Sequence, residues 1–132
     1  MIADCGARSV DYGMTTQELK KRTFEFGIRV VRAVEALPKN ETARTLGRQL
    51  LRAGTSVGAN YRAATRARSR ADFVAKLGIV EEECDEALYW MEVIVALQLV
   101  RQTRLLNLEA EASELLAIVV ASIKTARRGR RT

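Results

Sequence analysis

Apolar residues recur at intervals of three and four along four stretches of the chain, which is the spacing of one helical face. The first stretch predicts a helix over residues 16–37. It begins after Thr15, which forms a capping box with Glu18, and ends before Pro38, because the residue before a proline avoids helical angles. The face that we expect to be buried consists of Leu19, Phe24, Phe26, Ile28, Val31, Val34 and Leu37.

Asn40 is predicted to cap a second helix. Its apolar stripe is Leu46, Leu50, Ala53, Val57, Tyr61 and Ala64. Three glycines lie beside this stripe at positions 47, 54 and 58, and each costs a helix about 1 kcal/mol relative to alanine. Either a neighbouring backbone packs closely against them, or the helix breaks within residues 54–58. We favour the continuous helix.

Ser69, three residues before Asp72, predicts the start of a third helix over residues 70–100. Its inward stripe is Phe73, Leu77, Val80, Cys84, Ala87, Leu88, Met91, Ile94, Val95 and Gln98. Asn107 is predicted to cap the fourth helix, and the apolar stripe of that helix is Leu108, Ala112, Leu115, Leu116, Val119, Val120 and Ile123.

Four amphipathic helices joined by short loops predict an all-α fold, an antiparallel up-down four-helix bundle. A length of 132 residues fits one domain. We expect a flexible N-terminal segment over residues 1–14, the bundle over residues 15–125, and a basic flexible tail over residues 126–132 that carries Arg127 and Arg128.

Charge is distributed in blocks along the chain. The formal net charge is +6, and residues 44–70 hold seven arginines and no acid, whereas residues 81–92 hold six acids and no base. If the second helix continued through residue 70, six of these arginines would lie on one strip, within about 80° of arc. They are Arg44, Arg48, Arg52, Arg62, Arg66 and Arg70.

Two functions fit this arginine strip. Guanidinium groups match phosphate oxygens, so the six arginines, assisted by Arg127 and Arg128, could bind the backbone of RNA or DNA. Alternatively, they could pair with the acids of the third helix across a subunit interface, in a structural or adaptor ring. We expect Trp90, which lies off the core stripe, to contact a partner.

Candidate chemistry is sparse. The sequence contains no histidine and two cysteines, Cys5 and Cys84, so it lacks the commonest general base and the commonest metal ligand. We expect no enzymatic activity, no cofactor and no metal site. The sequence also has no apolar run long enough to span a membrane and no apolar leader, so we expect a soluble cytoplasmic protein.

Residues 52–62, RAGTSVGANYR, resemble the RAxxSxxxN motif of a bacterial family of four-helix-bundle proteins that was first found within intervening sequences of 23S rRNA genes. The stretches at 67–77 and 81–92 are similar to the same family, and the resemblance covers about residues 19–123. Arg52, Ser56, Asn60 and Arg62 match motif positions. Family members often carry a glutamate where this chain has Ala63 or Ala64.

The resemblance implies a four-helix bundle that assembles into a homopentameric ring. It also implies kinship with the accessory protein of diversity-generating retroelements, a basic pentamer that binds nucleic acid and a reverse transcriptase. The expected partners are therefore further copies of this chain, RNA or DNA, and a protein such as a reverse transcriptase. We assign Asn60, Tyr61 and Trp90 to an interface with a partner.

Overall fold

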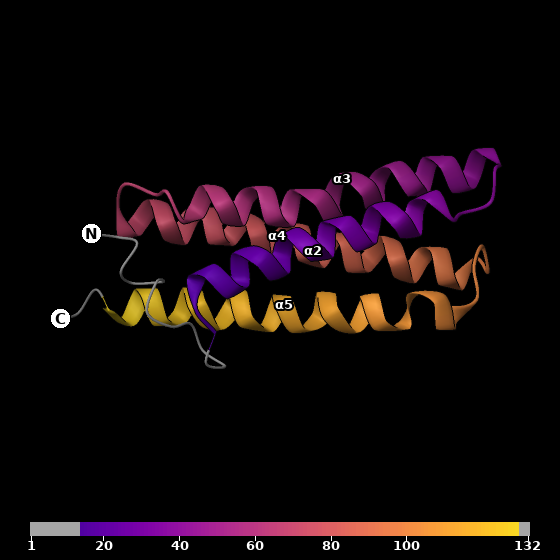
Figure 1. The fold of residues 1–132 in the computed structure, drawn as a ribbon. Helices are drawn as coiled ribbons and strands as arrows, with labels where there is room; N and C mark the ends of the chain where they lie inside the picture. The colour runs from indigo at the N-terminus through magenta and orange to yellow at the C-terminus, as the bar shows by residue number, and fades with distance from the viewer. Residues whose placement is uncertain (1–13, 130–132) are drawn as a thin grey trace.

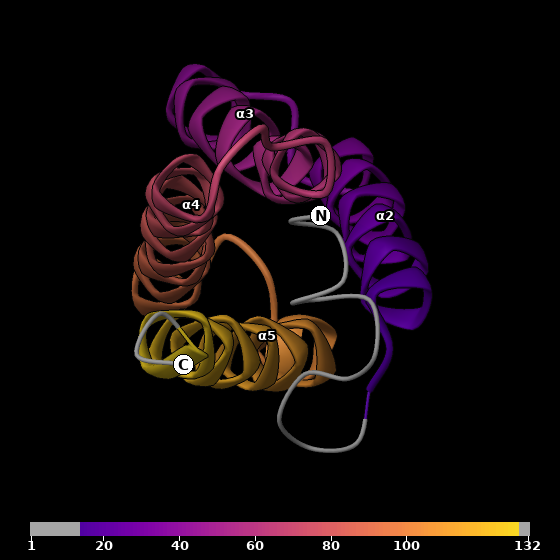
Figure 2. The same cartoon turned by 90° about the vertical axis from the view of Figure 1, so that its left-hand side faces the viewer.

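The computed structural model describes residues 14–129, and these residues form four helices. They are α2 (Thr16–Glu35), α3 (Glu41–Ala64), α4 (Arg70–Ala96) and α5 (Gln102–Gly129). The helices run alternately up and down with short connections, and each lies beside its sequence neighbour around the bundle (Figures 1 and 2). The prediction of an all-α up-down four-helix bundle is confirmed.

Three of the predicted helix starts are confirmed by their capping hydrogen bonds. The Glu18 backbone N–H donates to Thr15 Oγ1 at 3.0 Å, and the Thr15 backbone N–H donates to Glu18 Oε1 at 2.7 Å, which completes the capping box. Asn40 Oδ1 accepts from the Ala43 backbone N–H at 2.9 Å. Ser69 Oγ accepts from the backbone N–H three residues on at 3.0 Å. Local side-chain chemistry thus sets where α2, α3 and α4 begin.

The helix α3 is continuous through its glycines because α2 packs closely against them. A Cβ atom added at Gly58 would lie 3.1 Å from the Thr23 carbonyl oxygen, and one added at Gly54 would lie 2.7 Å from both methyl groups of Val30. The two backbones therefore approach to a distance that larger residues at these positions would prevent. Close packing, rather than a break in the helix, is confirmed.

This close contact corrects the predicted buried face of α2. Thr23 and Gly27 are buried against α3, whereas Phe24 is 65% exposed and Ile28 is 39% exposed. The expectation that Phe24 and Ile28 lie in the core is wrong. The apolar residues of α2 extend around more of the helix than the face that the core buries. Small residues occupy the centre of the contact between α2 and α3.

The first and last helices of the bundle meet through an ion-pair cluster. Arg22 of α2 donates to both carboxylate oxygens of Glu111 on α5, at 2.7 and 2.8 Å, and also pairs with Glu114. The hydrogen bond to Glu111 raises the pKa of Arg22. This α2–α5 contact is less extensive than the contacts between helices that follow one another in the sequence.

The end of α4 differs from the prediction. The helix ends at Ala96, and Gln98 is an exposed residue at φ 58° rather than a member of the inward stripe. The Leu99 backbone N–H donates to the Ile94 carbonyl at 3.1 Å, and the Gln98 backbone N–H donates to the Val95 carbonyl at 2.9 Å. These two bonds define a Schellman motif, in which glycine is the preferred residue at the position of Gln98.

Replacing Gln98 with glycine is therefore expected to stabilise the fold. A left-handed conformation costs a residue with a Cβ atom about 1–2 kcal/mol, part of which is returned as the greater entropy of glycine in the unfolded chain. We expect the free energy of unfolding to rise by up to about 1 kcal/mol, measured by urea denaturation. Gln102→Gly, in the first turn of α5, is the control and should not stabilise. A drop in stability for Gln98→Gly would contradict this account of the turn.

The bounds of α5 also differ from the prediction. It begins at Gln102 rather than after Asn107, because Leu105, 3% exposed, extends the buried stripe one turn toward the N-terminus. At the other end, Ala126 is 4% exposed and the helix continues to Gly129. Arg127 and Arg128 are therefore exposed residues of the last helical turn, whereas residues 130–132 lie outside the described part. The predicted N-terminal segment also lies outside it as far as residue 13.

Candidate nucleic-acid interface

The predicted arginine strip is only partly present. Arg44, Arg48, Arg52 and Arg62 are exposed on the outer side of α3. The helix ends at Ala64, so Arg66 lies in the connection to α4. Arg70, the last predicted member of the strip, is the first residue of α4. The prediction of one strip of six arginines is wrong, because it required a helix that continued through residue 70.

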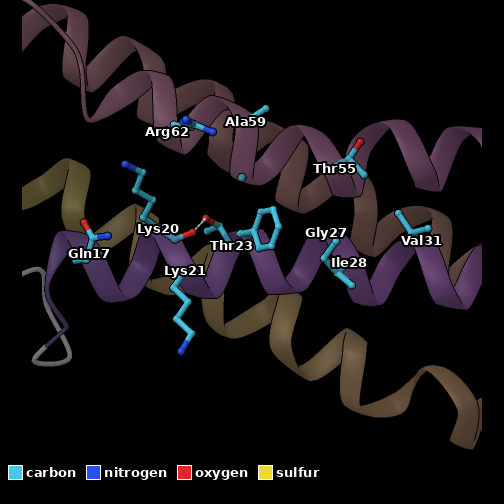
Figure 3. Close-up of a pocket in the computed structure, with 12 residues that line it drawn as sticks. Gln17, Lys20, Lys21, Thr23, Gly27, Ile28, Val31, Thr55, Ala59 and Arg62 are labelled. Carbon is cyan, nitrogen blue, oxygen red and sulfur yellow. Dashed lines mark hydrogen bonds between the residues drawn. The ribbon is translucent and has the colours of Figure 1, made fainter.

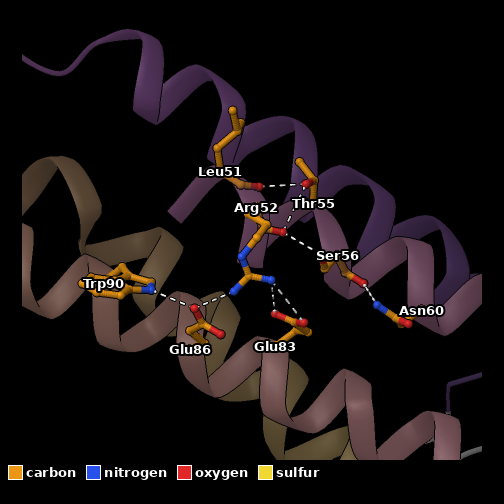
Figure 4. Close-up of polar contacts among 8 residues, drawn as sticks. All are labelled: Leu51, Arg52, Thr55, Ser56, Asn60, Glu83, Glu86 and Trp90. Atoms are coloured by element: carbon orange, nitrogen blue, oxygen red, sulfur yellow. Dashed lines mark hydrogen bonds and ion pairs between the residues drawn. The ribbon is translucent and has the colours of Figure 1, made fainter. Parts of the chain in front are cut away.

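Arg52 is held by carboxylates of α4 in the same chain (Figure 4). Its Nη2 donates to Glu86 Oε2 at 2.5 Å, and its Nη1 lies 3.4 Å from Glu83 Oε1. The bond from Arg52, together with one from the Trp90 indole, holds the pKa of Glu86 below its ordinary value. The acids of α4 thus neutralise Arg52 inside one copy of the chain. The structural-ring interpretation instead required the arginines of the strip to pair with acids across a subunit interface.

Trp90 and Asn60, both assigned to an interface, make contacts within the chain. The Trp90 Nε1–H donates to Glu86 Oε2 at 3.0 Å, and the ring is half-buried, edge-to-face with Tyr89 at a centroid distance of 5.0 Å. Asn60 Nδ2 donates to the Ser56 carbonyl of its own helix at 2.8 Å (Figure 4). Tyr89, 55% exposed, has a larger exposed fraction than Trp90 or Asn60.

Tyr61 is not at the surface. Its side chain is 1% exposed in the core, where burial raises the pKa of the phenol to about 12, an effect that the side chain of Thr16 partly opposes. The assignment of Tyr61 to an interface is therefore wrong. Its place in the apolar stripe of α3 determines its environment.

Arg70 has a structural role at the end of the bundle. Its Nη1 donates to the carbonyl oxygen of Ala126 in the last turn of α5, at 3.3 Å. Cations are favourable at helix C-termini, where carbonyl groups lack partners within the helix. The first residue of α4 thus ties the end of α5 to the connection between α3 and α4.

This tie brings two basic blocks, far apart in the sequence, to one end of the bundle. The α3–α4 connection carries Arg66 and Arg68, and the last turn of α5 carries Arg127 and Arg128; all four are exposed, and we call them the basic end. Both segments lie at the same end in Figure 1. Within the described residues, none of these four arginines forms an ion pair with a carboxylate.

The carboxylate nearest to the basic end in sequence is already paired. Asp72 Oδ1 accepts a hydrogen bond from Lys76 Nζ at 2.7 Å, one turn further along α4. That bond is the main reason why the pKa of Asp72 lies below its ordinary value, and the charge of Arg68 adds only a small effect. The basic end therefore keeps its net positive charge.

The described residues show little other candidate chemistry. Within residues 14–129, no three cysteine or carboxylate side chains are placed to hold a metal ion together. Cys84 is buried, and burial raises the pKa of its thiol to about 12, so the sulfur stays protonated and unreactive. None of the helices in this part of the chain combines the length and apolar character that crossing a bilayer requires.

The fold and its exposed arginines place the chain among small basic up-down four-helix bundles. The family of 23S rRNA-intervening sequence proteins matches residues 15–121, and the chain belongs to this family. The resemblance carried by residues 52–62, 67–77 and 81–92 is thus confirmed.

A solved structure supports the same assignment. A protein of unknown function from the S23 ribosomal protein family of Bacteroides thetaiotaomicron VPI-5482 superposes with a TM-score of 0.77 at 31% sequence identity, covering 83% of this chain and 97% of the other. No curated protein matches this sequence.

Proposed function

We propose that this protein is a non-enzymatic, self-associating four-helix bundle that binds the phosphate backbone of nucleic acid through its basic end. The observation that carries the proposal is the convergence of Arg66, Arg68, Arg127 and Arg128, exposed and without ion pairs to carboxylates in the described residues. Guanidinium groups that are not neutralised suit phosphate oxygens, which they can bind through two parallel hydrogen bonds.

The arginines elsewhere contribute less to this proposal. Arg52 is already neutralised by Glu83 and Glu86. Arg44 and Arg48 are exposed, but they lie about 30 Å along α3 from Arg66, at 1.5 Å per residue. Along the outer side of α3, the charge at the centre is thus neutralised and the remaining arginines lie at two separate ends. The end near the last turn of α5 carries more positive charge than the other.

Self-association extends the proposal. The family resemblance implies a homopentameric ring, and we propose that this chain forms one. A ring would repeat the basic end once per subunit and so place several such surfaces on one particle. Repeated weak sites bind a long nucleic acid more tightly than one site does, because the second contact is intramolecular.

Binding to a labelled structured RNA across a salt series tests this function. We expect the logarithm of the association constant to fall linearly with the logarithm of salt concentration, with a slope near −0.9 for each phosphate contacted in duplex regions. A DNA duplex of equal length, run alongside, tests whether the backbone alone suffices. No binding even at about 50 mM salt would contradict the proposal.

A further inference from the structure

A groove of about 460 Å³ runs along the outer side of the contact between α2 and α3 (Figure 3). Gly27, Gly58 and Ala59 line it without bulky side chains, and Phe24 and Ile28 border it with exposed apolar surface. We call this surface the α2–α3 groove. Contiguous exposed apolar surface commonly marks a binding site, and an apolar groove between two helices is a surface into which a third helix can dock.

One end of the groove is positively charged. Lys20, Lys21 and Arg62 line it there, and Figure 3 shows Lys20 extending from α2 toward Arg62 on α3. None of the three forms an ion pair within residues 14–129. An occupant of this groove therefore needs carboxylates at one end and apolar side chains one to two helical turns away.

The outer side of α4 has this composition. Ile79, Glu82, Asp85 and Tyr89 follow one another at spacings of three and four and so share one face, which we call the α4 outer face. Ile79 is 42% exposed and Tyr89 is 55% exposed. Both acids are exposed and form no ion pair in the part of the chain that the structure describes.

The charge and apolar positions of the two surfaces correspond. On α2, Lys21 precedes Ile28 by seven residues, and on α4, Glu82 precedes Tyr89 by seven residues, so each surface separates its charge from its apolar side chain by about 10 Å.

We propose that the α4 outer face of one copy docks into the α2–α3 groove of the next copy. This inference rests on the proposed self-association and names the surfaces that carry it. The two surfaces lie on different sides of the bundle, since α2 and α4 flank α3 on opposite sides in Figure 2. A contact between unlike surfaces of identical subunits is head-to-tail, which builds a ring wherever the rotation closes.

Blocking the groove tests the docking sterically. Ala59→Arg adds a large charged side chain at an exposed position in the groove, and Ala110→Arg, at an exposed position of α5, is the matched control. We expect light scattering to give 14.7 kDa, the mass of one chain, for Ala59→Arg, and the oligomeric mass of the unmodified protein for the control. Circular dichroism checks that both variants are folded.

Exchanging the charges identifies the occupant. Lys20→Glu with Lys21→Glu, and separately Glu82→Lys with Asp85→Lys, should each reduce the oligomeric mass, whereas the variant that combines all four should restore it. A groove that instead binds a second groove would leave the α4 variant fully assembled, and a different protein occupant would leave every variant at the mass of the unmodified protein. Either result would overturn the docking.

These outcomes are separable from failure of the proposed function. If the unmodified protein is monomeric throughout, self-association and this docking both fail, whereas RNA binding by the basic end is judged from the salt series alone. If the unmodified protein is oligomeric and Ala59→Arg keeps its mass, only the docking fails.

Discussion

Replacing Arg66, Arg68, Arg127 and Arg128 with alanine is expected to lower RNA affinity by about four thousandfold at about 0.1 M salt. Each duplex phosphate that the variant no longer binds removes about 0.9 from the slope of log affinity against log salt, which amounts to roughly eightfold in affinity at that concentration. The helical core should be unaffected, because all four side chains are exposed. Fluorescence anisotropy of a labelled RNA, repeated at several salt concentrations, measures both quantities.

The matched comparison uses two pairs of arginines near opposite ends of α3. Arg66→Ala with Arg68→Ala should reduce the affinity and the salt slope far more than Arg44→Ala with Arg48→Ala, although each pair removes the same charge. Equal reductions from the two pairs would show that net charge, or the whole outer side of α3, carries the binding. The basic end would then contribute no more to RNA binding than the other exposed arginines.

The second large effect concerns two glycines with opposite expected signs. Gly54→Ala should lower the free energy of unfolding by up to about 2 kcal/mol, because an added Cβ atom would lie 2.7 Å from the Val30 methyl groups and 2.9 Å from Val30 Cβ. Overpacking of this kind costs about 1–3 kcal/mol, which exceeds the gain of about 1 kcal/mol in helix propensity. Val30 is fully buried, so it can move away only by displacing its packed neighbours.

Gly78→Ala is the matched control, since nothing lies within 4 Å of the Cβ atom that it would add. The same change there should raise the free energy of unfolding by up to about 1 kcal/mol through helix propensity alone. Urea denaturation at equal protein concentration measures both variants. Stabilisation by Gly54→Ala would mean that the backbones of α2 and α3 are not held together as closely as these distances require.

The helices themselves could be predicted from local chemistry. Thr15, Asn40 and Ser69 cap helices by bonding backbone groups within three residues, so sequence alone contains the whole interaction. The start of α5 could not be predicted in this way, because it follows a Schellman turn in which Gln98 takes a conformation that usually indicates glycine. A residue in an unusual conformation leaves no mark in the sequence.

The surfaces were harder to predict because they depend on contacts between helices. Phe24 and Ile28 fit the apolar period of α2, yet the closest approach to α3 falls on Thr23 and Gly27. The basic end depends on where α3 stops and on Arg70 reaching the last turn of α5. Neither fact follows from the spacing of arginines within one helix.

The limited contact between α2 and α5 has a consequence for how the chain acquires its fold. The extensive contacts all join helices that are consecutive in the sequence, so few distant segments must meet before contacts begin to stabilise one another. Low contact order of this kind is characteristic of domains that fold within microseconds to milliseconds. The bundle can grow one helix at a time as the chain leaves the ribosome, with the ion pairs of Arg22 forming after α5 has been synthesised.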